Sequence, residues 1–296
     1  MSVHLLIAAV LAAVVAYGLA VAALYLLQDS LIFPRYAVPA LTRETLPPGA
    51  ERLELRAADG GHRLVGTLVR AAEGGGGKGV LLLGFAGNAT NAGEFALYLA
   101  RWLPDLDVAV FHYRGYAPSE GAPGEEALAV DAVTAYDHLA ARLRPARVLL
   151  AGFSIGSGVA ARLLLERRAD GLLLVTPFDS LEALAAERYP WMPVRLLLRH
   201  RFRSDLHLAG LDVPAAVIAA SDDRVVPAAR TEALLGVLAR PVLAETVPGS
   251  THGGIYGLPA MDAALRRAVD ALLAAADAPA GNIPDGASGC GPAGLC

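Results

Sequence analysis

Gly152-Phe153-Ser154-Ile155-Gly156 stands between a short apolar run, Arg147–Phe153, and a run of small residues, Ser157–Ala161. A strand that ends in Gly-x-Ser-x-Gly and turns at once into a helix places the serine in a strained turn with its hydroxyl exposed. Small residues are needed there because strand and helix approach each other closely. The flanking strand and helix make the motif far more specific than an isolated Gly-x-Ser-x-Gly. We therefore predict that Ser154 is a nucleophile.

The segments around this turn alternate between apolar runs and amphipathic stretches. This alternation predicts an α/β domain over residues 49–277, with a mostly parallel sheet that helices cover on both faces. Residues 178–210 break the rhythm with short helical pieces, and we predict that this insertion is a small lid over the site. The predicted strands span residues 51–57, 62–70, 80–85, 108–112, 147–153, 172–175, 215–220 and 241–247, and predicted helices end near residue 102 or span 125–143 and 259–275.

A serine hydroxyl needs a base to take its proton, and the base needs a carboxylate to orient it. In this topology the chain order is Ser, acid, His. Of the seven histidines, only His252 lies in a loop after the last predicted strand. Asp222 and Asp223 both follow the preceding strand, and because adjacent side chains point in different directions, only one of them is expected to face His252. Asp223 is favoured, since it stands four residues before Pro227, a typical helix-starting residue.

The amino-terminal run Val3–Leu27 is almost continuously apolar. As a helix it would be about 37 Å long, more than the roughly 30 Å hydrocarbon core of a bilayer. No basic residue precedes it and no small-x-small cleavage site ends it, so an uncleaved single-pass anchor is favoured over a signal peptide or a buried core helix. Residues 28–48 are predicted to be a connector, with Leu31–Arg35 close to the membrane surface.

Arg35 and Arg43 follow the anchor, which favours a cytoplasmic catalytic domain, and the Ala- and Arg-rich composition suggests a bacterial inner membrane. The net charge of −4 argues against nucleic acid as a partner. The chain shows neither a metal-ligand spacing nor a dinucleotide fingerprint, so we expect no metal and no cofactor. Both cysteines, Cys290 and Cys296, lie in a Gly-, Pro- and Ala-rich tail over residues 278–296, which is predicted to be disordered.

Several motifs are similar to those of the Bem46-like branch of the α/β-hydrolase superfamily, a group of membrane-anchored serine hydrolases. Besides the Ser154 motif, they are Leu31–Pro34, Tyr113-Arg114-Gly115-Tyr116, Thr176–Ser180, Tyr189-Pro190-Trp191, Asp223–Pro227 and Gly249–His252.

The resemblance implies an α/β-hydrolase fold with Ser154, Asp223 and His252 as catalytic residues. It also implies an oxyanion hole built from the backbone N–H groups of Asn88 and Ile155. Such relatives usually carry Phe-His-Gly-Asn-Ala after the third strand, whereas this chain has Phe85-Ala86-Gly87-Asn88-Ala89. We expect the oxyanion hole to be present despite the loss of that histidine, because backbone N–H groups form it. The replacement by Ala86 instead raises the question of how rigidly the loop is held.

The expected function is hydrolysis of carboxylic esters or thioesters, with a small molecule, a lipid or an acylated protein as substrate and the bilayer as partner of the amino-terminal helix. A peptidase, an amidase or an acyltransferase could use the same triad, and a non-catalytic membrane-tethered binding protein is the alternative of a different class. Arg114 and Asp131 are interpreted as structural. Trp191 and Leu196–Leu198 either line an acyl pocket, rest on the bilayer or form the core of the lid.

Overall fold

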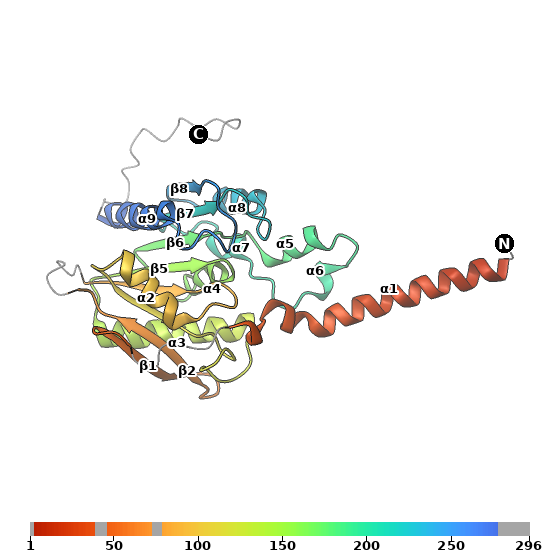
Figure 1. The fold of residues 1–296 in the computed structure, drawn as a ribbon, viewed down its shortest axis with the longest axis horizontal. Helices are drawn as coiled ribbons and strands as arrows, with labels where there is room; N and C mark the ends of the chain where they lie inside the picture. Colours follow the sequence, from red (N-terminus) through yellow and green to blue (C-terminus); the bar gives the residue numbers. More distant parts are fainter. Residues whose placement is uncertain (1–2, 39–45, 73–78, 278–296) are drawn as a thin grey trace.

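The computed structural model describes residues 3–38, 46–72 and 79–277 of the chain (Figure 1). The predicted disordered tail, with Cys290 and Cys296, lies outside the described residues.

An eight-stranded sheet forms the centre of this part of the chain, in the order β1-β2-β4-β3-β5-β6-β7-β8. β2 runs antiparallel to β1 and to β4, and all other neighbours are parallel, as the apolar runs predict. The strands are β1 (Ala50–Arg56), β2 (Arg63–Val69), β3 (Val80–Phe85), β4 (Asp107–Phe111), β5 (Arg147–Phe153), β6 (Gly171–Val175), β7 (Ala215–Ala220) and β8 (Pro241–Val247).

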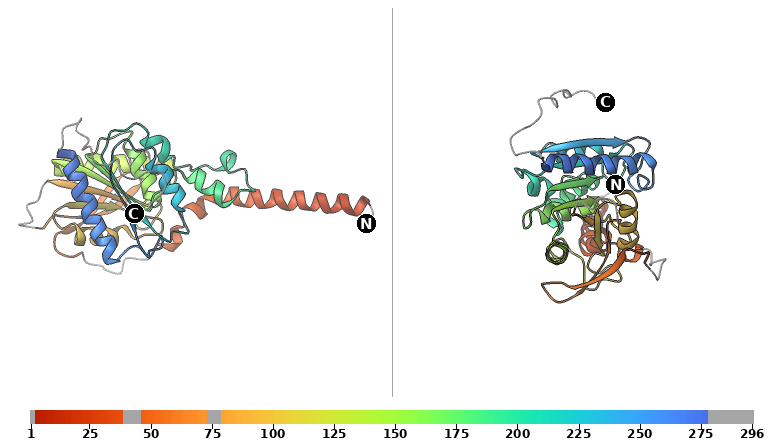
Figure 2. Two further views of the ribbon diagram at one scale, coloured as in Figure 1. Left: turned by 90° about the horizontal axis from the view of Figure 1, so that it is seen from above. Right: turned by 90° about the vertical axis from the view of Figure 1, so that its left-hand side faces the viewer.

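Helices cover both faces of the sheet (Figure 2), because neighbouring side chains of each strand point to opposite faces and most are apolar. In β3, Leu82 packs into one layer, while Leu81 and Leu83 pack into the other. The first layer is completed by α2 (Ala92–Trp102) and α9 (Pro259–Asp277), and the second by α3 (Glu125–Leu143), α4 (Ile155–Leu163), α7 (Ser204–Leu208) and α8 (Ala228–Leu235).

The amino-terminal helix α1 (Val3–Ile32) projects away from this body (Figure 1). It continues five residues past the predicted end at Leu27, so the expected connector over residues 28–48 begins too early. The helix continues because Gln28 finds hydrogen-bond partners in the body, where it is buried. A short 3₁₀ helix, η1 (Arg35–Ala37), follows. Phe33, expected at the membrane surface, is buried against the rings of Phe202 and His200.

The insertion over residues 178–210 contains α5 (Leu181–Arg188), α6 (Val194–Leu197) and α7. α5 and α6 lie beside the end of α1 that enters the body, a position that both figures show. The loops that follow the carboxyl ends of β3, β5, β7 and β8 line one cavity together with α5 and α6. This edge of the sheet carries the predicted site residues.

Candidate active site

Ser154 stands alone between the end of β5 and the start of α4. Its backbone has φ 51° and ψ −119°, a conformation that L-residues rarely adopt. The turn requires glycine on both sides. A Cβ atom on Gly152 would come within 2.5 Å of the Ser157 Cα atom, and one on Gly156 would come within 2.1 Å of the Phe85 carbonyl oxygen. The strained turn predicted from the sequence is therefore present, and it holds the Ser154 side chain at the floor of a cavity.

The three predicted catalytic side chains form one hydrogen-bonded chain. His252 Nε2 lies 2.9 Å from Ser154 Oγ, and His252 Nδ1 lies 2.7 Å from Asp223 Oδ2. Asp223 comes from the loop after β7 and His252 from the loop after β8, so parallel strands bring residues far apart in sequence to one edge. The Asp223 side chain is only 6% exposed, which keeps water from competing for the imidazole.

The two adjacent aspartates have different partners. Asp223 Oδ1 accepts hydrogen bonds from the N–H groups of Val225 and Val226, at 2.9 and 2.8 Å, which leaves Oδ2 directed at His252. The Asp222 carboxylate instead accepts a hydrogen bond from the Ser221 hydroxyl, and its side chain is exposed.

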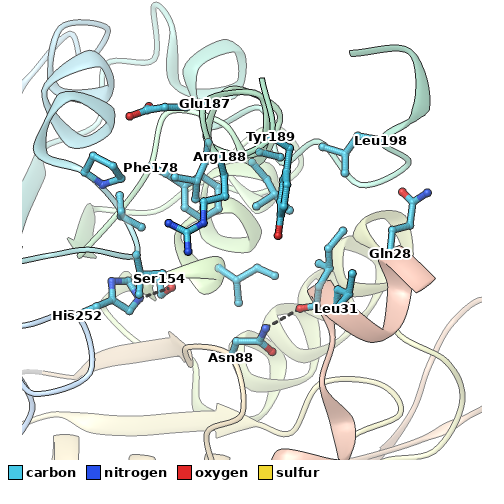
Figure 3. A pocket seen from close by; sticks show the side chains of 18 of the residues that line it. Gln28, Leu31, Asn88, Ser154, Phe178, Glu187, Arg188, Tyr189, Leu198 and His252 are labelled. Carbon is cyan, nitrogen blue, oxygen red and sulfur yellow. Dashed lines mark hydrogen bonds between the residues drawn. The ribbon is translucent and has the colours of Figure 1, made fainter. Parts of the chain in front are cut away.

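The loop after β3 is held in place although Ala86 replaces the histidine expected from the resemblance. The Tyr113 hydroxyl donates to the Ala86 carbonyl at 2.6 Å, and the Tyr116 hydroxyl donates to Asn88 Oδ1 at 2.7 Å. Asn88 Nδ2 in turn donates to the Ile32 carbonyl at the end of α1, at 2.6 Å (Figure 3). Sequence reasoning missed these two tyrosines as supports, although both lie in a quoted motif.

The two residues predicted for the oxyanion hole line the same cavity as Ser154. Ile155 is the first residue of α4, and the first N–H groups of a helix have no partner within the helix. The Asn88 side chain is held in place by three hydrogen bonds, because its Oδ1 accepts from Tyr116 and Ala89 while its Nδ2 donates to Ile32.

The cavity above Ser154 measures about 830 Å³, and apolar side chains dominate its walls (Figure 3). Two features of its lining were not predicted. The end of α1 forms one wall, and Arg188 at the end of α5 points into the cavity toward Ser154. The lining residues from α1 are Leu24, Gln28, Leu31 and Ile32, and those from the insertion include Phe178, Leu181, Leu184, Tyr189, Met192, Val194, Leu197 and Leu198.

Tyr256 closes the cavity beside His252, where it packs on Phe153 and Phe95. Burial raises the pKa of its hydroxyl to about 12, which keeps the group neutral. Among the described residues, no group of three or more His, Cys, Asp and Glu side chains is arranged to hold a metal ion.

Arg114 and Asp131, interpreted as structural, lie away from this cavity. The Arg114 side chain is 6% exposed and pairs with Asp131 at 2.5 Å and with Asp59 at 2.7 Å. The hydrogen bond from Arg114 holds the pKa of the Asp59 carboxyl below its usual range. This cluster joins the β1–β2 turn to α3, which agrees with the structural interpretation.

No family model matches the chain. Among curated proteins, it is 35% identical to an uncharacterized protein of Mycobacterium tuberculosis, Rv2307c, over 228 residues, which cover 76% of this chain and 80% of that protein. It is 30% identical to the zebrafish (Danio rerio) lysophosphatidylserine lipase ABHD12 over 168 residues, which cover 50% of this chain and 44% of that lipase.

Solved structures share the fold at low identity. A lidless α/β serine hydrolase from Xanthomonas campestris superposes with a TM-score of 0.59 at 19% identity, over 77% of this chain and 97% of that one. Esterase PF2001 from Pyrococcus furiosus gives a TM-score of 0.60 at 16% identity, over 80% and 96%. The chain has the α/β-hydrolase fold, and it belongs to one family with the Mycobacterium tuberculosis protein Rv2307c.

Proposed function

We propose that this α/β hydrolase is a membrane-anchored serine esterase that cleaves carboxylic ester or thioester bonds. The observation that carries the proposal is the hydrogen-bonded chain from Asp223 through His252 to Ser154, which ends on a serine in a strained turn below an apolar cavity. That arrangement is the geometry of nucleophilic acyl transfer.

Each group has a defined part in the proposed reaction. Ser154 Oγ attacks the substrate carbonyl while His252 Nε2 takes its proton and then passes it to the leaving group. Asp223 keeps the imidazole in the tautomer with a proton on Nδ1. The N–H groups of Ile155 and Asn88 stabilise the oxyanion. A water molecule, activated by His252, then hydrolyses the acyl-enzyme.

The role of α1 as a single-pass anchor is part of the same proposal. Residues Val3–Ala37 include an 18-residue window with mean hydropathy 2.6, and no part of that window is buried in the protein. A core helix of this composition would be covered by other elements, whereas α1 leaves its apolar side chains exposed. We place the catalytic domain on the cytoplasmic side, since Arg35 and Arg43 follow the anchor.

An acyl lipid with one anionic group near the ester is the substrate class that fits the cavity best. Its walls are apolar, and Arg188 brings a positive charge toward Ser154. In the described part of the chain, no hydrogen bond or ion pair occupies the Arg188 guanidinium, which leaves it able to bind a carboxylate or phosphate. The zebrafish relative is named a lysophosphatidylserine lipase, which points to the same class.

A substrate panel tests the proposed chemistry. Purified full-length protein is assayed with long-chain carboxylic esters, thioesters and amides, next to Ser154→Ala, Asp223→Asn and Asp222→Asn variants. We expect ester or thioester turnover that is lost in Ser154→Ala and falls by about 10³- to 10⁴-fold in Asp223→Asn, because the wrong imidazole tautomer is favoured. Asp222→Asn is the matched control and should stay within about twofold of wild type. Equal losses at the two aspartates would contradict the assignment.

The role of Arg188 is tested separately with an anionic lysophospholipid and with a neutral monoacylglycerol, which has no phosphate. Arg188→Gln should raise KM for the anionic substrate by about tenfold, the loss of one charge-assisted contact, and leave the neutral one unchanged. Arg168→Gln, at an exposed arginine between α4 and β6 outside the cavity lining, is the control. A KM that rises equally for both lipids would show that Arg188 does not select charge.

A further inference from the structure

The segment Tyr189–Leu198, which we call the lid tip, contacts α1 as well as the body of the protein. The Tyr17 hydroxyl donates to the Trp191 carbonyl at 3.0 Å, and the rings of the two residues meet edge to face at 6.2 Å between centroids. Tyr17 belongs to the apolar run Val3–Leu27. The lid tip therefore reaches the part of α1 that is proposed to lie in the bilayer.

A second set of contacts fixes the base of the lid tip to the end of α1. Gln28 accepts a hydrogen bond from the Arg199 N–H at 2.8 Å and donates one to the Leu197 carbonyl at 3.3 Å. The Arg199 guanidinium also pairs with Asp29 at 3.2 Å. Tyr17 and Asp29 are separated by about 18 Å along the helix axis, close to the roughly 15 Å hydrocarbon depth of one leaflet.

The lid tip has the surface of a segment that lies in lipid. Leu196 is 82% exposed and Trp191 49% exposed, and neither lines the cavity. Tyr189 is also exposed, and aromatic side chains of this kind favour the membrane interface. Arg195 on the same short helix is exposed and can extend to anionic headgroups.

The backbone of the lid tip is also suited to a medium without water, where unpaired polar groups are costly. Pro190 and Pro193 have no N–H group. Six of the other eight residues, Tyr189, Met192, Val194, Leu196, Leu197 and Leu198, donate their N–H groups to a backbone carbonyl, and the Trp191 carbonyl accepts from Tyr17.

The cavity above Ser154 extends to this place. Leu24 of α1 lines it and lies inside the apolar run, three residues before its end, while Met192 and Leu197 line it from the lid tip. A lipid chain could pass from the leaflet to Ser154 between walls that are mainly apolar.

We propose that α1 and the lid tip form a lateral entrance that opens into one bilayer leaflet, through which an acyl chain reaches Ser154 without leaving the membrane. This inference rests on the proposed function of the site and on α1 as an anchor. The lid tip lies in the leaflet beside α1, with Trp191 and Leu196 in contact with lipid.

Tryptophan quenching tests the location of the lid tip independently of catalysis. The full-length chain contains two tryptophans, so Trp102→Phe leaves Trp191 as the only fluorophore, and Trp191→Phe leaves Trp102 at the opposite end of the body as the control. Both variants are reconstituted into vesicles of phosphatidylcholine and phosphatidylglycerol with or without bromine on the acyl chains. We expect bromine to quench Trp191 at least about twofold more than Trp102. Equal quenching of the two would overturn the proposal.

A second measurement tests lateral entry. Leu196→Glu is compared with Leu165→Glu, an equally apolar exposed position on the turn after α4. We expect Leu196→Glu to lower the ratio of long-chain ester turnover in vesicles to short soluble ester turnover about tenfold, because a charge replaces a lipid-facing leucine. Leu165→Glu should leave the ratio unchanged. A constant ratio in both would overturn lateral entry, whereas failure of wild type to react with a fluorophosphonate would instead overturn the proposed function.

Discussion

Single residues around Ser154 meet steric demands that explain the small side chains of the motif. Gly156 touches the Phe85 carbonyl so closely that α4 and β3 could not keep their distance with any larger residue. The motif and its order along the chain could be recognised from the sequence, because such demands act between near neighbours. From the sequence, Asp223 could be favoured over Asp222 only by its distance to Pro227. The hydrogen bonds that settle the geometry come from Val225 and Val226, which carry no pattern of their own.

Gly156→Ala should lower the free energy of unfolding by about 3 kcal/mol, because its Cβ would overlap the Phe85 carbonyl and force the backbone apart. Gly236→Ala is the matched control. Its Cβ would meet only ordinary van der Waals neighbours at the end of α8, so its effect should stay within about 0.5 kcal/mol. Urea denaturation of the detergent-solubilised protein measures both, and similar values for the two variants would contradict this explanation.

The buried side chain of His112 should make the free energy of unfolding depend measurably on pH. It is buried at the end of β4, its Nδ1 has no hydrogen-bond partner in the described part of the chain, and burial lowers its pKa to about 4. In the unfolded chain the imidazole titrates near 6.5, so between these values the unfolded state binds the extra proton and stability falls as the pH falls.

When the pH is lowered from 7 to 4.5, His112 alone should lower the free energy of unfolding by about 2 kcal/mol. Denaturation at the two pH values, in wild type and His112→Leu, measures the contribution as a difference of slopes. The half-buried His207, whose pKa is also lowered by burial, is present in both proteins and cancels. Identical pH slopes would show that His112 does not titrate as proposed.

At the scale of elements, the strands could be predicted to within about a residue, because most are apolar runs and β1 alternates polar with apolar residues, with turn residues at their ends. The end of α1 could not be predicted in this way. Gln28 and Asp29 look like the start of a polar connector, and only their partners in the insertion explain why the helix continues. The support of the loop after β3 by Tyr113 and Tyr116 was missed for the same reason, since a tyrosine in a loop does not reveal its acceptor.

Tyr113→Phe tests that support. Loss of the hydrogen bond to the Ala86 carbonyl should loosen the loop that carries Asn88 and lower kcat about fivefold, with little change in KM. Tyr136→Phe is a matched control, because its hydroxyl also donates to a backbone carbonyl at 2.6 Å, that of Arg168 just before β6, at the opposite end of that strand from the site. Steady-state kinetics on one ester decide the matter, and equal kcat values for the two variants would count against it.

At the scale of the whole molecule, composition and length predicted a long apolar helix followed by an α/β domain, and the structure contains both. The use of α1 as a cavity wall could not be predicted, because it depends on how the insertion folds back beside it.

The full chain should sediment with membranes and stay there in alkaline carbonate, which removes peripheral proteins but not spanning helices. A reporter that is active only in the cytoplasm should be active when it is fused after α9, whereas a reporter that is active only in the periplasm should be inactive there. Extraction by carbonate would contradict the anchor, and a periplasmic reporter signal would contradict the orientation.

The activation of Ser154 as a nucleophile is tested most directly by covalent capture with a fluorophosphonate, followed by peptide mapping. Cleavage with trypsin after Arg147 and Arg162 isolates Ser154 on one peptide. We predict a single phosphonate adduct on that peptide, absent in Ser154→Ala and slowed by more than about a hundredfold in His252→Ala. An unlabelled wild-type protein that remains folded, or a label on another residue, would contradict the account.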